Sequence, residues 1–310
     1  MGRWLRILLS LCWLGLLSGP PTGAAMPRPA RVILISLDGA RPDALQQADM
    51  PHLAGLAASG AVDWAAQTVF PPVTLPAHTS MLTGLAVADH GVDWNGTNPG
   101  CLPVEPPTFL TLAERAGYRT AFVSGKEKFC HLVQTPEMDY TFALAGDRSI
   151  ADRALELLQD GYQVIFLHFP NPDYFGHLHG WMSDTYLSEL TSSDAQIGRV
   201  LAKLEALGVA DQTLIIVTAD HGGHDFEHGA RRPEDMTIPW MIAGPGVLSG
   251  TALAGVQVTD TAATVLWVLG LPSPPGLTGR PVCAAFGLVP DDAAGCRAAA
   301  GGAAQAEGAL

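Results

Sequence analysis

The sequence has 310 residues, of which 48% are hydrophobic, and its formal net charge at pH 7 is −13. A chain of this length and composition can bury a large core, which excludes a largely disordered protein and predicts one large domain or two smaller ones. The acidic balance disfavours a nucleic-acid groove, because a negative surface repels a phosphate backbone. A small anionic substrate stays compatible with this charge, since bound divalent cations would offset it locally.

The first residues have the pattern of a secretory signal peptide. Arg3 and Arg6 provide a basic start, residues 7–17 form an apolar run, and residues 23–25 are small. The apolar run has eleven residues, too few to span the ~30 Å hydrocarbon core of a bilayer. We therefore predict cleavage after Ala25 and no stable membrane insertion. Loss of two arginines and no acidic residue moves the formal charge from −13 to −15. The mature protein is expected to be exported, either to a periplasm or as a secreted protein.

Cleavage would also remove Cys12 and leave four cysteines, an even number for an oxidising compartment. Proximity along the chain favours the disulfides Cys101–Cys130 and Cys283–Cys296, although four cysteines allow three connectivities. Free buried thiols are the alternative. No Cys-x-x-Cys pair occurs, so the sequence does not support a cysteine-rich zinc site.

Short apolar runs rich in β-branched residues alternate with helix-like segments along the chain. The runs at residues 31–37, 120–124, 164–169 and 214–218 predict buried strands. The segments at 51–58, 108–116, 150–158 and 186–207 predict helices, and residues 259–271 resemble a late helix. This alternation predicts an α/β fold, a three-layer sandwich with helices on both faces of a mainly parallel central sheet.

Polar residues of one kind follow three of the predicted strands. Asp38 comes directly after the first run, Asp173 and His177 follow the run at 164–169, and Asp220 and His221 follow the run at 214–218. In such a fold, ligands bind beyond the carboxyl ends of the strands. We therefore expect these aspartates and histidines to meet at one edge of the sheet.

These residues have the ligand types of a site for two divalent metal ions. Two such ions stabilise the attacking and the leaving oxygen of a displacement at phosphorus, and they need about six carboxylate and imidazole ligands. His228 supplies the sixth ligand after Asp38, Asp173, His177, Asp220 and His221. His224 lies in the same glycine-rich loop and is an alternative sixth ligand. The donor types favour zinc.

Taken together, several motifs resemble those of the alkaline phosphatase superfamily, within it the nucleotide pyrophosphatase/phosphodiesterase branch. The matching segments are LDG at 37–39, PPVTLPAH at 71–78, HGVDWN at 90–95, PDYFGH at 172–177 and ADHGGHDFEHG at 219–229. The resemblance implies an alkaline phosphatase-like catalytic domain over residues 26–290. The remaining Ala/Gly-rich residues 291–310 are expected to form a disordered tail. The sequence does not indicate an oligomeric state.

The resemblance also implies roles for individual residues. Asp38, Asp220 and His221 would hold the metal ion that activates the nucleophile, and Asp173, His177 and His228 the ion on the leaving-group side. Thr74 matches the nucleophile, which would form a phospho-threonine intermediate. Asn95 matches an asparagine that binds a phosphate oxygen. The alternatives are a helix N-cap for Thr74 and N-glycosylation for Asn95, which begins an Asn-Gly-Thr sequence.

Other polar and aromatic residues near the motifs receive no chemical role. We interpret Lys126 as a solvated loop lysine. The histidines His78, His90, His168 and His179 are interpreted as core or loop residues. The aromatic residues Trp94, Tyr174, Phe175 and Phe226 would flank a substrate or simply pack.

The predicted activity is hydrolysis of phosphodiester or pyrophosphate bonds in a small anionic substrate. A sulfatase is disfavoured, because the segment at Thr74 lacks the cysteine and arginine of sulfatase motifs. The motifs also lack an arginine of the kind that favours monoesters, which favours diesters. Hydrolysis of phosphonates or phosphomonoesters at the same metal site is one alternative, and a non-catalytic exported metal-binding protein is another. A phosphoethanolamine transferase is disfavoured because its membrane helices are absent.

Overall fold

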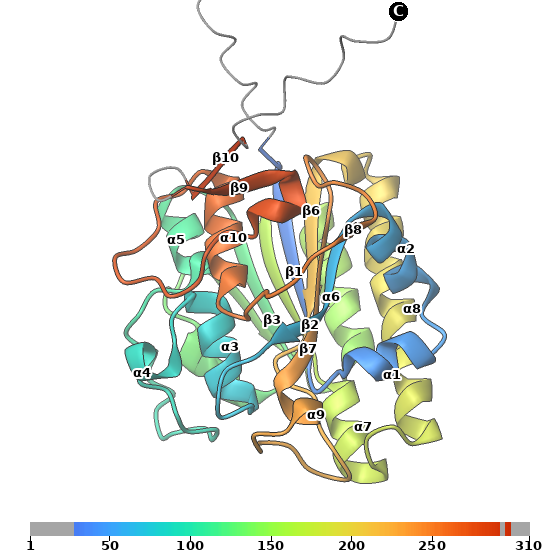
Figure 1. Cartoon of the computed structure of the whole chain (residues 1–310). Helices are drawn as coiled ribbons and strands as arrows, with labels where there is room; N and C mark the ends of the chain where they lie inside the picture. Colours follow the sequence, from blue (N-terminus) through green and yellow to red (C-terminus); the bar gives the residue numbers. More distant parts are fainter. Residues whose placement is uncertain (1–27, 292–294, 299–310) are drawn as a thin grey trace, which may run out of the picture.

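A computed structural model describes residues 28–291 and 295–298 of the chain. The predicted signal peptide at residues 1–25 and the end of the predicted tail at 299–310 lie outside the described residues. The described chain forms a three-layer α/β sandwich around a mainly parallel sheet, which confirms the predicted fold class (Figure 1).

The central sheet has eight strands. They are β1 (Arg31–Leu37), β2 (Ala61–Gln67), β3 (Thr120–Ser124), β4 (Asp139–Phe142), β5 (Val164–Phe169), β6 (Thr213–Thr218), β7 (Thr237–Ala243) and β8 (Thr251–Ala252). Their order across the sheet is β4-β3-β5-β1-β6-β7-β2-β8. The strands from β4 to β6 are parallel, whereas β7 runs antiparallel to both of its neighbours.

Helices cover both faces of this sheet (Figure 1). One layer contains α1 (Pro42–Gln47), α2 (Pro51–Ser59), α6 (Asp147–Gln159), α7 (Asn171–His179) and α8 (Asp184–Ala206). The other contains α3 (Thr74–Thr83), α4 (Val87–His90), α5 (Phe109–Arg115) and α10 (Asp260–Leu269). A short helix, α9 (Pro233–Met236), lies with α7 at one end of the sheet. None of the helices in the described ranges is long and apolar enough to cross a membrane.

The centre of the sheet follows from the apolar runs in the sequence. All residues of β5 and β6 are buried, and so are all residues of β1 except Arg31. A strand buried on both faces has no alternation of polar and apolar residues, which is why these runs are continuous. The predicted strands agree with β1, β3, β5 and β6 to within one residue.

The chain beyond the sandwich is fastened by a disulfide. β9 (Leu288–Asp291) and β10 (Gly295–Ala298) form an antiparallel ribbon, and Cys296 of β10 is bonded to Cys283. Residues 291 and 295–298 are therefore paired strand, where the sequence predicts a disordered tail from residue 291 onward. The second disulfide joins Cys101 to Cys130, so both predicted pairings are confirmed.

A buried carboxyl group anchors the start of α7. The backbone N–H of Asn171 donates to Asp147 Oδ1 at 3.1 Å, and the Asn171 side chain accepts from the Asp147 N–H at 3.3 Å. The Ser193 hydroxyl of α8 donates to the other Asp147 oxygen. Burial raises the pKa of Asp147 to about 7, and the hydrogen bonds from Ser193 and Asn171 only partly offset this. The three helices α6, α7 and α8 thus meet at one titratable group.

Asp147→Asn should change how stability depends on pH. The folded-state pKa of Asp147 is raised above its ordinary value of 3.8, so its stabilising contribution is full below about pH 4 and is lost as the pH rises through about 7. The wild-type free energy of unfolding should therefore fall relative to the variant over this range, by at most about 1.4 kcal/mol per pH unit. Urea denaturation between pH 4 and 8 measures this. Asp152→Asn, an exposed position on the same helix, is the control. Parallel curves for wild type and Asp147→Asn would contradict the prediction.

Candidate active site

The candidate site lies where the three central strands end. β1 pairs with β5 on one side and β6 on the other, with Leu37 opposite Phe169 and Ser36 opposite Thr218. This register brings three loops to the same edge, near α7 and α9 (Figure 1). Asp38 follows β1, Asp173 and His177 lie on α7 after β5, and Asp220 and His221 follow β6.

The structure brings the six predicted metal ligands together. One ligand atom each from Asp38, Asp220 and His221 lie within 4.8 Å of one another, and so do ligand atoms of Asp173, His221 and His228. His177 Nε2 lies 3.4 Å from Asp173 Oδ1. The residues thus form two adjacent acidic groups, and His221 lies between them.

The histidine rings are oriented by backbone carbonyl groups. The Nδ1 atoms of His177, His221 and His228 lie 2.7–3.0 Å from the carbonyl oxygens of Phe226, Gly222 and Pro72, respectively. Since a carbonyl oxygen only accepts, each Nδ1 carries a proton, and Nε2 of the neutral ring has a free lone pair. These Nε2 atoms face carboxylate oxygens at 3.2–3.5 Å.

Two acceptors that face each other repel unless a cation or a proton lies between them. Asp38 Oδ1, Asp173 Oδ1, Asp220 Oδ2 and His221 Nε2 are buried and have no hydrogen-bond partner. Burial and nearby His221 lower the pKa of His228 to about 4, so that its ring is neutral at pH 7. Buried carboxylate oxygens that accept no hydrogen bond, next to imidazole Nε2 atoms, are the ligand types that a divalent ion such as zinc requires, so the residues fit such a site.

His224 is engaged elsewhere. Its Nδ1 lies 2.6 Å from Asp235 Oδ1, and Asp235 also accepts a hydrogen bond from the backbone of Ala230. His228 Nε2, by contrast, lies 3.5 Å from Asp173 Oδ1. Between the two alternatives for the sixth ligand, the geometry therefore favours His228.

Thr74 begins α3 and is buried next to the acidic groups. Val73 occupies the N-cap position, and the Thr74 hydroxyl makes no capping bond, so the capping alternative is not what the structure shows. Lys126 Nζ donates to Thr74 Oγ1 at 3.1 Å. Asn95 Oδ1 accepts from the backbone N–H of Leu75 at 2.9 Å and from Lys128 Nζ at 3.1 Å. Thr74 and Asn95 are thus neighbours at the start of the helix.

Lys126 is not the solvated loop residue that the sequence suggests. Its Nζ lies 2.6 Å from Asp38 Oδ2 and 2.7 Å from Asp173 Oδ2, one carboxylate from each acidic group. Burial opposes ionisation of all three side chains, yet their attraction raises the pKa of Lys126 and lowers the pKa values of Asp38 and Asp173. The one signal in the sequence was its place directly after the predicted strand at 120–124, at the same edge of the sheet.

Two further histidines contact the carboxylate ligands Asp38 and Asp220. The Gly125 N–H donates to His168 Nδ1 at 3.1 Å, so the other nitrogen, Nε2, carries the proton and donates to Asp38 Oδ2 at 2.7 Å. His78 lies 3.3 Å from Asp220 Oδ2 and 2.8 Å from Ser36 Oγ. From the sequence we interpreted both residues as core or loop histidines, because a histidine in an apolar segment is usually part of the packing and has no chemical role.

Close packing at two glycines holds the loops together. Gly39 has φ +72°, and a Cβ there would lie 3.0 Å from the Cα of Asp173. A Cβ at Gly223 would lie 2.2 Å from the Trp181 ring. A side chain at Gly39 would push α7 away from the strand ends, and one at Gly223 would displace Trp181.

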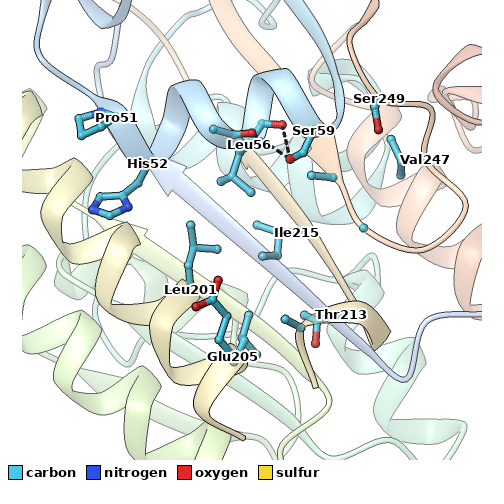
Figure 2. Close-up of a pocket in the computed structure, with 15 residues that line it drawn as sticks. Pro51, His52, Leu56, Ser59, Leu201, Glu205, Thr213, Ile215, Val247 and Ser249 are labelled. Carbon is cyan, nitrogen blue, oxygen red and sulfur yellow. Dashed lines mark hydrogen bonds between the residues drawn. The ribbon is translucent and has the colours of Figure 1, made fainter. Parts of the chain in front are cut away.

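A cavity of about 520 Å³ lies elsewhere, between α2 and α8 (Figure 2). Its lining includes Leu56, Leu201 and, from the start of β6, Thr213 and Ile215. The acidic groups follow the opposite end of β6. This cavity is therefore separate from the candidate site.

Comparison with known proteins identifies the family. The family model described as type I phosphodiesterase/nucleotide pyrophosphatase matches residues 32–237. The chain belongs to this family. The predicted resemblance to the nucleotide pyrophosphatase/phosphodiesterase branch is thereby confirmed.

The chain is also similar to individual relatives and solved structures. The bis(5'-adenosyl)-triphosphatase ENPP4 of Homo sapiens is 26% identical over 239 residues, covering 70% of this chain and 53% of the relative. The chain thus spans about half the length of this curated relative. Murine ectonucleotide pyrophosphatase/phosphodiesterase 5, an inactive threonine-to-alanine variant in complex with AMP, has a TM-score of 0.69 at 16% identity, over 79% of this chain and 96% of that chain. A phosphonate monoester hydrolase from Silicibacter pomeroyi has a TM-score of 0.68 at 18% identity, over 85% and 78%. These likenesses confirm the alkaline phosphatase-like fold.

Zinc should bind to the acidic groups and stabilise the folded protein. At a free Zn²⁺ concentration 100-fold above Kd, the expected gain is about 2.7 kcal/mol. His228→Ala removes one proposed ligand and should weaken Zn²⁺ binding about tenfold or more. Calorimetric titration of chelator-treated protein measures the affinity. His179→Ala, an exposed histidine on α7 outside both groups, is the matched control. Equal Zn²⁺ affinity in the two variants would contradict the ligand assignment.

Proposed function

We propose that the protein is a metal-dependent hydrolase of phosphodiester or pyrophosphate bonds, with Thr74 as its nucleophile. The observation that carries this proposal is the buried Thr74 hydroxyl, held by Lys126 next to two acidic groups with unpaired oxygens. Family membership supports it.

The proposed cofactors are two divalent metal ions, zinc by the donor types. Asp38, Asp220 and His221 would hold one ion. Asp173, His177 and His228 would hold the other. When bound, such ions supply Lewis acidity that lowers the pKa of a hydroxyl and neutralises charge on phosphate oxygens.

The chain's own residues position the nucleophile. The Lys126 ammonium donates to Thr74 Oγ1 and so stabilises the alkoxide that forms when the hydroxyl loses its proton. Attack of Oγ1 on phosphorus forms a phospho-threonine and expels the leaving group on the opposite side. Water then hydrolyses the phospho-threonine and regenerates the hydroxyl.

Asn95 is proposed to bind a non-bridging phosphate oxygen. Its side-chain oxygen accepts from Leu75 N and Lys128 Nζ, which turns the amide oxygen toward the helix. The two N–H donors of its side-chain amide are then available to a phosphate oxygen next to Thr74. N-glycosylation at this position would require the same nitrogen.

One observation favours a second candidate function, the hydrolysis of phosphomonoesters or phosphonates. Lys126 and Lys128 both reach the start of α3, where they contact Thr74 and Asn95. Two ammonium groups are suited to a doubly charged phosphoryl group, as in a phosphomonoester or phosphonate. From the sequence we expected diesters, because the motifs lack an arginine that would bind the second charge of a monoester. The two lysines partly replace that missing positive charge.

Export is proposed from the cysteines and the first 25 residues. The two disulfides fit a protein that folds in an oxidising compartment, a periplasm or the extracellular space.

Thr74→Ala should abolish turnover without loss of metal. We expect kcat to fall by about 10³-fold or more, whereas Thr74→Ser, which keeps a hydroxyl, should retain measurable activity. Steady-state assays with a 4-nitrophenyl diester, mass spectrometry of acid-quenched enzyme and Zn²⁺ content are the readouts. Thr185→Ala, an exposed threonine in the first turn of α8, is the control. Hydrolysis that Thr74→Ala leaves unchanged would reject Thr74 as the nucleophile, and bound Zn²⁺ without turnover by the wild-type protein would support the non-catalytic metal-binding alternative.

A substrate panel should separate the two candidate functions. The first candidate predicts a higher kcat/KM for methyl 4-nitrophenyl phosphate than for 4-nitrophenyl phosphate or phosphonoacetate. The Lys128→Ala variant adds a charge test: if Lys128 binds a second negative charge, its loss should lower kcat/KM for the monoester more than for the diester. A strong preference for the monoester or the phosphonate would replace the first candidate by the second.

A further inference from the structure

The loop that carries Asn95 has no regular structure of its own. Residues 94–104 form neither helix nor strand, and residues 96–100 are all exposed. We call residues 94–104 the Asn95 arm. The Asn95 side chain nevertheless has a defined place, since its oxygen accepts from Leu75 N and Lys128 Nζ. An exposed loop keeps such a place only when other parts of the protein fasten it.

A short helix beside the arm is anchored in the core. This 3-10 helix, η1 (Glu127–Leu132), buries Phe129 and Leu132 completely. The centroid of the Phe129 ring lies 4.4 Å from that of His168 and 4.7 Å from that of His78. These are the two histidines that contact the carboxylate ligands. η1 therefore has a fixed position relative to the acidic groups.

His131 of η1 contacts the arm through both of its ring nitrogens. Its Nε2 accepts from the backbone N–H of Asn98 at 3.1 Å, and its Nδ1 lies 2.7 Å from the carbonyl oxygen of Leu102. One nitrogen accepts and the other donates, which is the pattern of a neutral imidazole with its proton on Nδ1. The ring also packs edge to face against Trp94, with centroids 4.7 Å apart. His131 is only 1% exposed, so water does not compete for these bonds.

We propose that His131 is a positioning residue for Asn95, the residue that would bind a non-bridging phosphate oxygen. This inference rests on the proposed function. The His131 ring holds the arm on both sides of Asn95, at Trp94 directly before it and at Asn98 three residues after it. The backbone at Asn95 is thereby fixed, so that its amide oxygen stays on Leu75 N and its amide N–H groups stay directed at the phosphate.

The disulfide between Cys101 and Cys130 holds the same arm but does not replace this role. Cys101 lies six residues beyond Asn95, and residues 96–100 between them are exposed. A covalent link at that separation limits how far the arm can move, yet it leaves the backbone dihedral angles near Asn95 free. Loss of the His131 ring should accordingly release Asn95 while the arm stays tethered.

Hydrogen exchange tests the positioning without any need for turnover. The Leu75 N–H at the start of α3 has Asn95 as its acceptor. In His131→Leu this amide should exchange about tenfold faster relative to the Met81 amide in the middle of the same helix. His131→Gln, whose side-chain amide offers one acceptor and one donor, should keep most of the protection. Leu157→Ala, a buried leucine on α6 in the other helix layer, is the control for lost stability and should not raise the ratio.

A double-mutant cycle tests whether His131 acts through Asn95. Asn95→Ala and His131→Leu should each lower kcat/KM for methyl 4-nitrophenyl phosphate about tenfold, mainly through a higher KM, because the lost hydrogen bond binds ground state and transition state alike. Adding His131→Leu to Asn95→Ala should then cost less than about twofold. Zn²⁺ affinity should stay at the wild-type value, because neither residue belongs to the two acidic groups.

The outcomes separate this inference from the proposed function. An unchanged ratio of Leu75 to Met81 exchange in His131→Leu, or losses in kcat/KM that add in the double variant, would overturn the positioning role and leave Thr74-dependent hydrolysis intact. Faster Leu75 exchange in a protein that hydrolyses no phosphoester would support the positioning of Asn95 by His131 and reject the hydrolase.

Discussion

Three buried carboxylates within reach of one another are the constraint on which the rest of the structure depends. Asp38, Asp173 and Asp220 are brought to one edge because they follow adjacent parallel strands, and burial without compensation would cost several kcal/mol for each ion. The surrounding groups partly offset this cost. Lys126 bridges two of the carboxylates, and His168 donates to one of them. The oxygens that receive no donor are those that face the imidazole lone pairs. The same arrangement thus decides which carboxylate oxygens have hydrogen-bond donors within the protein and which remain free to bind a cation.

The orientation of the imidazoles depends on the backbone more than on other side chains. Carbonyl groups of Pro72, Gly222 and Phe226 fix the protonated nitrogen of three rings; Pro72 precedes α3, and Gly222 and Phe226 lie in the loop after β6. The loop after β6 is packed closely, as at Gly223 against Trp181. The chemistry of the site is therefore a property of how the loops pack, and a small displacement of any of them would turn a lone pair away from its carboxylate.

The central fold and the ligand set could be predicted from the sequence because both follow from strong local patterns. β1, β3, β5 and β6 are continuous apolar runs, and the polar residues directly after them had to meet at one edge. β7 and β2 were not predicted, since β2 contains Asp63 and Gln67 and β7 contains Pro239, and their antiparallel pairing is a long-range choice. Lys126 was missed for a related reason: its partners Asp38 and Asp173 are far away in sequence, and a lysine beside a glutamate in a loop looks solvated. The strand at residues 295–298 was not predicted either, although the disulfide that joins its Cys296 to Cys283 was.

Because the site residues are widely spaced along the chain, the site forms late during synthesis and folding. Asp38 is among the first residues of the sandwich to be synthesised, and His228 emerges only after β6 is complete. One acidic group spans residues 38–221 and the other residues 173–228, so a product truncated before the end of β6 lacks His221 and has neither group complete. Ion capture would accordingly report that β1, β5 and β6 have come together.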